Sequence, residues 1–341
     1  MKKFISGNDA AVQGALASGA QAMYGYPITP STEILQIWSE EADKNDRLIF
    51  LQTEDETTAG FAVNGSVLMG VKAFTATSGP GTVLMQDGLS MAENLRLPTV
   101  TIVMQRGGPS TGQVNYSQQE LNLAVFGGNG EGLRIVYSAG TPQEMYDFTL
   151  EAFDSAWRYK FPTLVLGDGY IGKQKTEVEL KHPLNPYQNS SLLAGKNLRN
   201  CYSSEEQFYE YLSKNILDFE ERSSLIARSE SIGPKNAPEL IVAHGSVFFV
   251  IREALKVIDP KSKKYQLFRP VTLRPFPKQD LKVAARGKKK IWFFESSYGQ
   301  LYHLVSAELD AASVSAKIIK VFKPAYRFLP EDIADSLKGG K

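Results

Sequence analysis

The chain has 341 residues, 43% of them hydrophobic and 22% charged, and a length of this order predicts two domains with a substantial buried core. Its 38 basic and 37 acidic residues leave a formal net charge of +1, which gives no electrostatic reason to expect nucleic acid or an anionic membrane as a partner. The single cysteine, Cys201, excludes an internal disulfide and a zinc or iron–sulfur site held by several cysteines of this chain.

The amino-terminal stretch MKKFISGNDAAVQ becomes polar within a few residues, and no long apolar run occurs later in the chain. It therefore lacks the apolar core of a signal peptide and a segment long enough to cross a bilayer. We expect a cytoplasmic protein with no membrane span.

Strand and helix patterns alternate through the first 176 residues. Short apolar runs that predict strands occupy 22–26, 47–53, 71–77, 99–105, 133–139 and 162–168, and helical patterns lie between them. The last of these helices, 141–159, begins with Thr141, Pro142 and Glu144, the pattern of a capping box with proline in the first turn. Val-, Ile- and Leu-rich strands alternating with helices predict a parallel sheet covered on both faces.

The alternation stops between 177 and 236 and resumes afterwards. The intervening stretch is polar and contains one charged amphipathic helix at 203–225, as in a linker with a bridging helix. Strand patterns at 239–246, 265–271, 289–297 and 316–322, with a helical pattern at 247–258, then predict a second, smaller α/β domain over 237–341.

Three loops in the first domain each follow a predicted strand. In YGYPITPSTEI (24–34), Pro27 and Pro30 restrict the backbone around Ile28 and Thr29. The same stretch also fits a rigid turn that caps a helix over 31–39 through Ser31 or Thr32.

The other two loops are ATSGPGTVLM (76–85), a glycine-rich strand-to-helix turn, and QRGGPSTG (105–112), in which Arg106 adds a positive charge suited to a carboxylate. Each pattern is weak alone, since such turns and solvated arginines are common. Because the carboxyl ends of parallel strands meet at one edge of a sheet, the three together predict one shared polar cleft.

Three consecutive carboxylates, Glu54, Asp55 and Glu56, stand at the start of the helical pattern at 56–70. Such a cluster commonly interacts with the helix dipole and has no other role. Glu56, however, opens a helix of small residues with Gly65 nine positions later. The histidines His182, His244 and His303 are scattered without metal-ligand spacing, and we interpret each as structural.

The ordered set of motifs closely resembles the alpha subunit of 2-oxoacid:ferredoxin oxidoreductases. The run GNDAAVQGALASGA, YGYPITPSTEI, EDE, AVNGS, VKAFTATSGPG and QRGGPSTG carries the match, which continues through VLGDGYIG, FRPVTLRPFP and ESSYGQL and so spans nearly the whole chain. Within the family, the chain is most similar to the branch that acts on 2-oxoisovalerate or 2-oxoglutarate.

The resemblance implies a fold and a set of partners. It implies an α/β protein with a pyrimidine-binding-type thiamine-diphosphate domain (1–176), a linker (177–236) and a transketolase-C-terminal-like domain (237–341). It also implies that the cofactor's diphosphate, its Mg²⁺ and a [4Fe–4S] cluster belong to a beta subunit, with gamma and delta subunits in some members. The reaction implied is oxidative decarboxylation of a 2-oxoacid with coenzyme A as a substrate, to acyl-CoA, CO₂ and reduced ferredoxin.

The resemblance also implies roles for individual residues. Glu56, by its spacing to Gly65, matches the glutamate that shares a proton with the cofactor's aminopyrimidine, with Glu54 as the nearest competitor. Thr29 and Arg106 match the residues that face the substrate carboxylate. The residues expected at the cofactor are Tyr26, Pro27, Ile28, Thr29, Glu56, Ser78, Gly79, Pro80 and Gly81, and no metal ligand is expected in this chain.

Two further stretches bear on these roles: an incomplete magnesium motif, which agrees with the resemblance, and one departure from the family pattern. Gly167-Asp168-Gly169 resembles the start of the GDG…NN motif that holds magnesium and diphosphate, but no Asn-Asn pair follows at the required distance, so we interpret it as a turn. The stretch QVNYSQQELNLAVF (113–126) lacks the Thr-Lys-x-Glu-Gln segment of 2-oxoglutarate-type members, which favours an apolar 2-oxoacid. A non-redox thiamine-diphosphate enzyme (a decarboxylase or transketolase-like half) and a catalytically silent scaffold subunit remain as alternatives.

Overall fold

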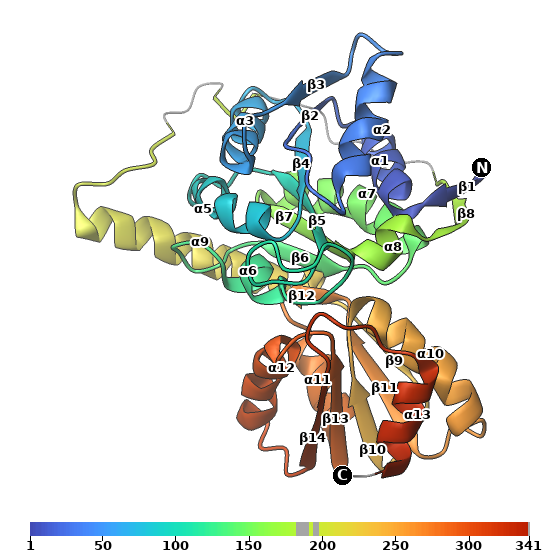
Figure 1. Ribbon diagram of the computed structural model, residues 1–341. Helices are drawn as coiled ribbons and strands as arrows, with labels where there is room; N and C mark the ends of the chain where they lie inside the picture. Colours follow the sequence, from blue (N-terminus) through green and yellow to red (C-terminus); the bar gives the residue numbers. More distant parts are fainter. Residues whose placement is uncertain (182–190, 194–197, 340–341) are drawn as a thin grey trace.

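Parallel strands build two sheets that lie in separate lobes (Figure 1). The structure is a computed structural model that describes residues 1–181, 191–193 and 198–339, so His182 and a part of the predicted linker lie outside the described residues. The larger sheet has the order β12-β6-β7-β5-β4-β2-β3. Its strands are β2 (Ala22–Gly25), β3 (Ile49–Gln52), β4 (Ala73–Thr77), β5 (Val100–Gln105), β6 (Ile135–Ser138), β7 (Thr163–Asp168) and β12 (Thr272–Arg274).

Helices cover both faces of this sheet, as the strand patterns predict. One group contains α1 (Gly7–Ala17), α2 (Thr32–Ala42) and α7 (Pro142–Tyr159), and the other α3 (Glu56–Leu68), α4 (Pro80–Leu84) and α5 (Gln86–Asn94). Phe74 of β4 packs against Trp38 and Phe153 of the first group, with ring centroids 4.9 and 6.0 Å apart. Thr75, the next residue along β4, faces the α3–α5 group across a small cavity. This alternation follows from the two-residue period of a strand.

Two predicted helix starts differ in detail from the structure. At α2, Ser31 occupies the cap position but its hydroxyl donates to the carbonyl of Ile28 and caps no helical amide. At α7, Thr141 Oγ1 accepts from the amide of Glu144, as predicted. The Glu144 carboxylate does not return to the Thr141 amide, however; it accepts from the Gly140 amide and pairs with Arg269 from the other lobe.

The smaller sheet has the order β14-β13-β10-β11-β9, and apart from β9 its strands lie in the stretch for which the sequence predicts a second α/β domain. Its four predicted strands are parallel, and an additional antiparallel strand, β9, borders β11. The strands are β9 (Ser229–Ile232), β10 (Glu239–Val242), β11 (Tyr265–Pro270), β13 (Lys290–Glu295) and β14 (Lys317–Phe322). Its helices are α10 (Gly245–Ile258), α11 (Lys278–Ala285), α12 (Gln300–Ala311) and α13 (Pro330–Gly339).

Several connecting elements join the lobes. The bridging helix α9 (Glu205–Ile226) forms where the sequence predicts it and extends along and beyond the larger lobe (Figure 1). Strand β12, from the carboxy-terminal third of the chain, adds an antiparallel edge to the larger sheet beside β6. Two smaller features belong to the larger lobe: strand β1 (Lys2–Ser6) pairs with β8 (Lys175–Glu179), and α6 (Leu121–Phe126) precedes β6.

None of the helices in the described part of the chain has the length and apolar character that a membrane span requires.

The expectation of a plain turn at Gly167-Asp168-Gly169 is wrong. Asp168 ends β7 and caps a short helix, α8 (Gly169–Lys173), because its Oδ1 accepts from the amides of Tyr170 and Ile171. The buried carboxylate therefore satisfies amides that the first turn of a helix leaves without partners.

A buried ion pair fastens the smaller lobe to the larger one. Arg269 of β11 is fully buried and donates from both terminal nitrogens to the Glu144 carboxylate, at 2.8 and 2.7 Å, and to the carbonyl of Ser138 at 2.6 Å. Nearby, His244 Nδ1 lies 2.9 Å from Ser138 Oγ, and burial, assisted by Arg269, lowers the pKa of His244 to about 3. His244 is thus a neutral structural residue, in agreement with the sequence interpretation, whereas His303 is exposed.

Removing the carboxylate from this ion pair should strongly destabilise the protein. We expect Glu144→Ala to lower the free energy of unfolding by about 3 kcal/mol, because the guanidinium stays buried without its main counter-ion. Asp154→Ala is the matched control on the same helix: its pair with Arg158 is solvent-accessible, so the loss should stay below about 1 kcal/mol. Urea denaturation of both variants measures the difference, and equal losses would contradict the assignment.

Candidate active site

The three loops predicted to share one site are in contact. They follow β2, β4 and β5, which are neighbours in the larger sheet, so all three leave the same edge. Nη1 of Arg106, after β5, donates to the carbonyl of Thr29, after β2, at 2.8 Å. Between them lies Gly79, after β4, where a Cβ atom would stand 2.6 Å from Nε of Arg106.

Glu56 enters this edge from α3. It is the first residue of the helix, capped by Asp55, and only 4% of its surface is exposed. A Cβ atom at Gly81 would stand 2.3 Å from both Glu56 Oε1 and Thr77 Oγ1, so only glycine fits here. Burial raises the pKa of Glu56 and Asp55 adds to this, while the helix amide and Arg106 lower it. The carboxyl therefore holds its proton to a higher pH than an ordinary glutamate does.

Several buried polar atoms at this edge lack hydrogen-bond partners among the described residues. They are Glu56 Oε1, Thr77 Oγ1, Ser78 Oγ and Arg106 Nε. Buried polar groups in proteins are nearly always paired, and unpaired ones cost about 1–3 kcal/mol each. Four such atoms around two close-packed glycines therefore indicate a place where a polar ligand supplies the missing partners.

The predicted site residues divide into buried and exposed sets. Glu56, Ser78, Gly81 and Arg106 are buried, and Tyr26, Pro27 and Thr29 are exposed on the outer side of the same edge. Glu54 is exposed, unlike Glu56. Ile28, Gly79 and Pro80 complete the predicted set: Ile28 and Pro80 are half-buried, and Gly79 adopts a left-handed φ of 52°.

A further buried carboxylate, Glu120, was missed by the sequence interpretation. It accepts hydrogen bonds from the Arg106 amide at 2.9 Å and from the hydroxyl of Thr82. It lies in QVNYSQQELNLAVF, a stretch that sequence reasoning used only for its missing lysine. No local pattern marks the residue, because its partners stand 14 and 38 positions away in the chain.

Comparison with known proteins decides the family. Residues 13–215 match the family model of pyruvate flavodoxin/ferredoxin oxidoreductase, thiamine-diphosphate-binding domain, and residues 237–324 match that of pyruvate:ferredoxin oxidoreductase core domain II. The 2-oxoglutarate synthase subunit KorA of Methanocaldococcus jannaschii is 31% identical over 99% of both chains. The ketoisovalerate oxidoreductase subunit VorB of Methanothermobacter marburgensis is 31% identical over 88% of this chain and 87% of that one. The chain belongs to the 2-oxoacid:ferredoxin oxidoreductase family, as an alpha subunit.

Two solved structures share the fold of this chain. A 2-oxoglutarate:ferredoxin oxidoreductase from Magnetococcus marinus, solved with 2-oxoglutarate, coenzyme A and succinyl-CoA, matches with a TM-score of 0.88 and 26% identity. The match covers 99% of this chain and 65% of that one, so this chain spans about two thirds of its length. A split-gene transketolase matches in fold alone, with a TM-score of 0.62 and 12% identity. The predicted fold class, a thiamine-diphosphate-type domain beside a transketolase-like one, is confirmed.

The residues of the alpha subunit fit the pyrimidine end of thiamine diphosphate. The unpaired Glu56 carboxyl, beside a glycine that admits no side chain, can meet a flat nitrogen-rich ring. The needs of the diphosphate and its metal are separate from those of the ring. Asp168, the acid of the GDG sequence, is used in capping α8, and the described residues contain no group of three or more potential metal ligands.

The raised pKa of Glu56 predicts a pH-dependent stability. Because the folded protein keeps this proton above the ordinary value of 4.5, stability should fall as pH rises through the raised pKa. Glu56→Gln should remove the part of this loss of stability that comes from Glu56. At neutral pH the variant should therefore have a higher melting temperature than wild type, whereas below pH 4.5 it should have no such advantage. The exposed Glu54→Gln is the control and should follow wild type. A Glu56→Gln curve parallel to wild type would contradict the burial of an ionisable carboxyl.

Proposed function

We propose that this alpha subunit supplies the aminopyrimidine-binding half of a thiamine-diphosphate site in an enzyme that converts a 2-oxoacid and coenzyme A to acyl-CoA, CO₂ and reduced ferredoxin. The observation that carries the proposal is the buried Glu56 carboxyl, unpaired at Oε1 and seated against Gly81. Because Gly81 has no side chain, it leaves a slot that a flat ring can enter. The Glu56 carboxyl lies at this slot and can donate a proton to the ring.

In this site Glu56 holds a proton at the ring nitrogen of the aminopyrimidine and exchanges it during turnover. Burial raises the pKa of Glu56, which makes this carboxyl a better proton donor to hold at the ring than an ordinary ionised glutamate. Bound thiamine diphosphate supplies the electron sink for the carbon that loses CO₂. The hydroxyls of Thr77 and Ser78, which lack partners among the described residues, offer further hydrogen bonds around the ring.

Arg106 and Thr29 hold the carboxylate of the 2-oxoacid in this proposal. Arg106 is only 5% exposed, and its Nε has no hydrogen-bond partner among the described residues. A buried guanidinium with a free donor binds a carboxylate more strongly than a solvated one, since water does not compete for it. Its bond to the Thr29 carbonyl also fixes the exposed proline-bound loop beside it.

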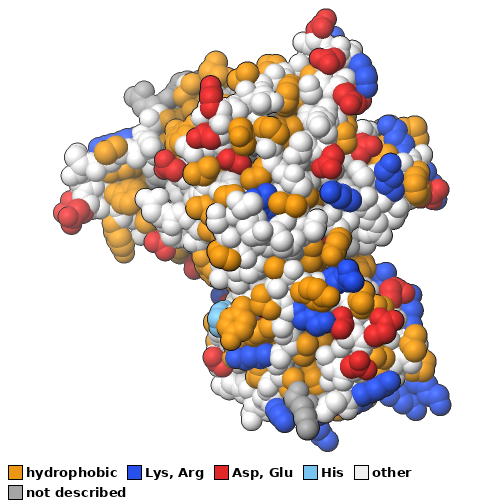
Figure 2. Space-filling model, in the orientation of Figure 1, with side chains coloured by type: hydrophobic (Ala, Val, Ile, Leu, Met, Phe, Trp, Pro, Cys, Tyr) orange, Lys and Arg blue, Asp and Glu red, His pale blue; other side chains and the backbone are white. Residues whose placement is uncertain are grey.

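The rest of the cofactor site belongs, in our proposal, to a beta subunit that carries the diphosphate, Mg²⁺ and a [4Fe–4S] cluster. Large apolar side chains stay exposed around the Glu56 edge, where a partner would cover them: Tyr26, Leu51, Phe61, Val83 and Leu84. Figure 2 shows hydrophobic side chains gathered over the α3–α5 region of the larger lobe, with acidic ones among them. Cys201, the only cysteine, is exposed and cannot hold a cluster alone. Gamma and delta subunits and ferredoxin complete the proposed assembly, in the cytoplasm.

An apolar 2-oxoacid such as 2-oxoisovalerate fits the loops better than 2-oxoglutarate. Residues 24–31, 76–85 and 105–120 contain one cation, Arg106, so a second carboxylate would find no partner in them. Within the last of these ranges, Tyr116 stacks on Tyr170 of α8, with ring centroids 4.6 Å apart. Two alternative functions are less consistent with these observations. A catalytically silent scaffold subunit would need neither the unpaired Glu56 carboxyl nor the Arg106 cation. A non-redox thiamine-diphosphate enzyme agrees less well with the relatives, which are named as a 2-oxoglutarate synthase subunit and a ketoisovalerate oxidoreductase subunit.

Glu56→Gln should lower 2-oxoacid-dependent reduction of ferredoxin or dye by the assembled complex at least 100-fold. The amide keeps the shape of the side chain but cannot exchange the proton, and general acid–base steps commonly contribute about 10²–10⁴-fold. Glu54→Gln, the neighbouring exposed carboxylate, should stay within threefold of wild type. If Glu54→Gln were the inactive variant, the proton-exchanging role would move to Glu54.

Arg106→Ala should raise KM for every 2-oxoacid by a similar factor of about 10- to 150-fold, the range for one charge-assisted pair. Arg106→Lys should recover only part, since one ammonium cannot form two parallel hydrogen bonds. Pyruvate, 2-oxoisovalerate and 2-oxoglutarate assays compare the factors. Unchanged KM values with a lower melting temperature would show that Arg106 only braces the Thr29 loop.

A further inference from the structure

Glu120 sits beneath the site loops without reaching the open edge. Its side chain is 3% exposed, and each of its oxygens accepts a hydrogen bond from a different site loop. Oε1 accepts from the amide of Arg106 at the end of β5, and Oε2 accepts from the hydroxyl of Thr82 in α4. One buried carboxylate thus ties the loop after β5 to the loop after β4.

Both tethered residues adjoin the groups proposed to act on ligands. Thr82 follows Gly81, the glycine against which the Glu56 carboxyl lies. The Arg106 amide belongs to the same residue whose guanidinium contacts Thr29 and Gly79. A shift of Glu120 would therefore move both Gly81, which lies against the Glu56 carboxyl, and the backbone of Arg106.

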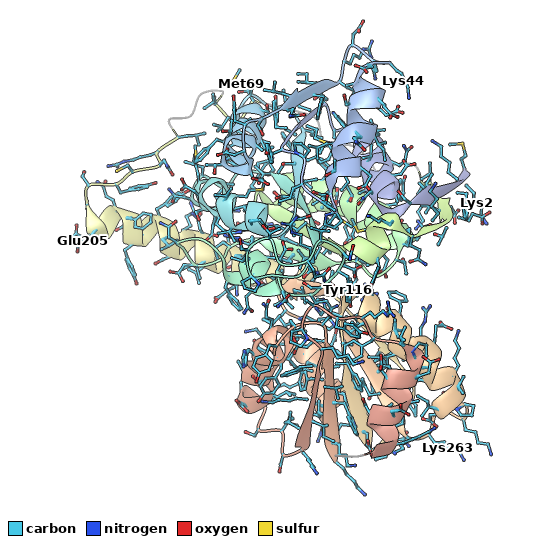
Figure 3. The ribbon with its side chains drawn as sticks, in the orientation of Figure 1. Lys2, Lys44, Met69, Tyr116, Glu205 and Lys263 are labelled. Atoms are coloured by element: carbon cyan, nitrogen blue, oxygen red, sulfur yellow. The ribbon has the colours of Figure 1, made fainter. Side chains whose placement is uncertain are left out.

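The smaller lobe fixes the segment that carries Glu120. Gln118 exchanges hydrogen bonds with the backbone of Ser296 and donates to the carbonyl of His244 at 2.9 Å. Gln300 of α12 donates to the carbonyl of Gln119 at 2.7 Å and accepts from the amide of Asn122 at 2.9 Å. Figure 3 places Tyr116, in the same segment, at the junction of the two lobes.

Burial raises the pKa of Glu120, and the hydrogen bonds from Thr82 and from the amides of Arg106 and Gly79, together with the charge of Arg106, oppose the rise without reversing it. Both oxygens of Glu120 have donors, whereas the Glu56 carboxyl has an oxygen without a donor among the described residues.

We propose that Glu120 is a positioning residue for the 2-oxoacid reaction: held by the smaller lobe, it sets Gly81 against Glu56 and aims Arg106. The proposal rests on the proposed function, because it takes Glu56 and Arg106 as the groups that meet the ligands. In this proposal the larger lobe supplies the side chains of the site, and the smaller lobe holds the segment that positions two of them.

The test compares Glu120→Gln with a matched control, Glu93→Gln, in the assembled complex. Glu93 is likewise buried and pairs with a buried arginine, Arg134; none of the hydrogen bonds described joins Glu93 directly to the three loops, and its link to the Thr82 carbonyl runs through Arg134 and Gln86. We expect Glu120→Gln to lower kcat/KM for the 2-oxoacid about 10- to 100-fold, the effect of leaving one buried hydrogen-bonding group without its partner. Glu93→Gln should stay within threefold of wild type, although both variants lower the melting temperature by a similar amount.

A double-mutant cycle with Thr82→Val separates positioning from general loss of structure. If Glu120 acts through its bond to Thr82, the double variant Glu120→Gln/Thr82→Val should be little worse than the poorer single variant. With Glu93→Gln as partner, the effects of Thr82→Val should simply multiply. The inference is overturned if Glu120→Gln keeps kcat/KM within threefold of wild type, or if its loss multiplies with that of Thr82→Val.

Glu56→Gln, measured in the same complex, keeps this test separate from that of the proposed function. An active Glu56→Gln variant removes the proposed function itself. An inactive Glu56→Gln variant beside a Glu120→Gln variant that behaves like Glu93→Gln removes only the positioning role.

Discussion

Two backbone positions without side chains let the site loops approach one another: Gly81 lies against the Glu56 carboxyl, and Gly79 lies against the Arg106 guanidinium. Any Cβ atom there would stand 2.6 Å or less from the facing side-chain atoms. The Glu56 carboxyl from α3 and the Arg106 guanidinium, which follows β5, therefore lie at one edge of the sheet, on either side of the turn after β4. The parallel order β5-β4-β2 makes this meeting possible, because it directs all three loops to the same side.

The buried charges of the molecule differ in how completely they are paired, and this difference follows their use. Arg269 has a bidentate carboxylate partner at the junction of the lobes, and Arg134 pairs with Glu93 inside the larger lobe. The Nε atom of all three arginines lacks a partner among the described residues, but there the Arg106 guanidinium forms no ion pair and donates to a backbone carbonyl, and Glu56 Oε1 accepts no hydrogen bond. Buried ions that face a counter-ion stabilise one arrangement of the chain, whereas a buried cation and a buried carboxyl without one can be completed by a ligand.

Local sequence predicted most of the parallel strands and their helices, but it did not predict contacts between distant segments. Apolar strand runs predicted the parallel strands, and the proline and glycine motifs predicted which loops share an edge. Strand β12 could not be predicted, because three residues carry no strand period and their pairing with β6 depends on how the lobes dock. The Glu144 carboxylate left its predicted capping role because Arg269, 125 positions away, competes for it. Glu120 was missed for the same reason, since its role exists only once α4 and β5 are side by side.

The central claim is that this chain holds half of a cofactor site, the half that meets the pyrimidine. Calorimetric titration of thiamine diphosphate with Mg²⁺ into the isolated chain, and into the complex assembled with its partner subunits, tests it most directly. The account predicts saturable binding by the complex and no saturable binding by the isolated chain, because the described residues offer a slot for the ring but no metal-binding group for the diphosphate. Tight, magnesium-dependent binding by the isolated chain would contradict it.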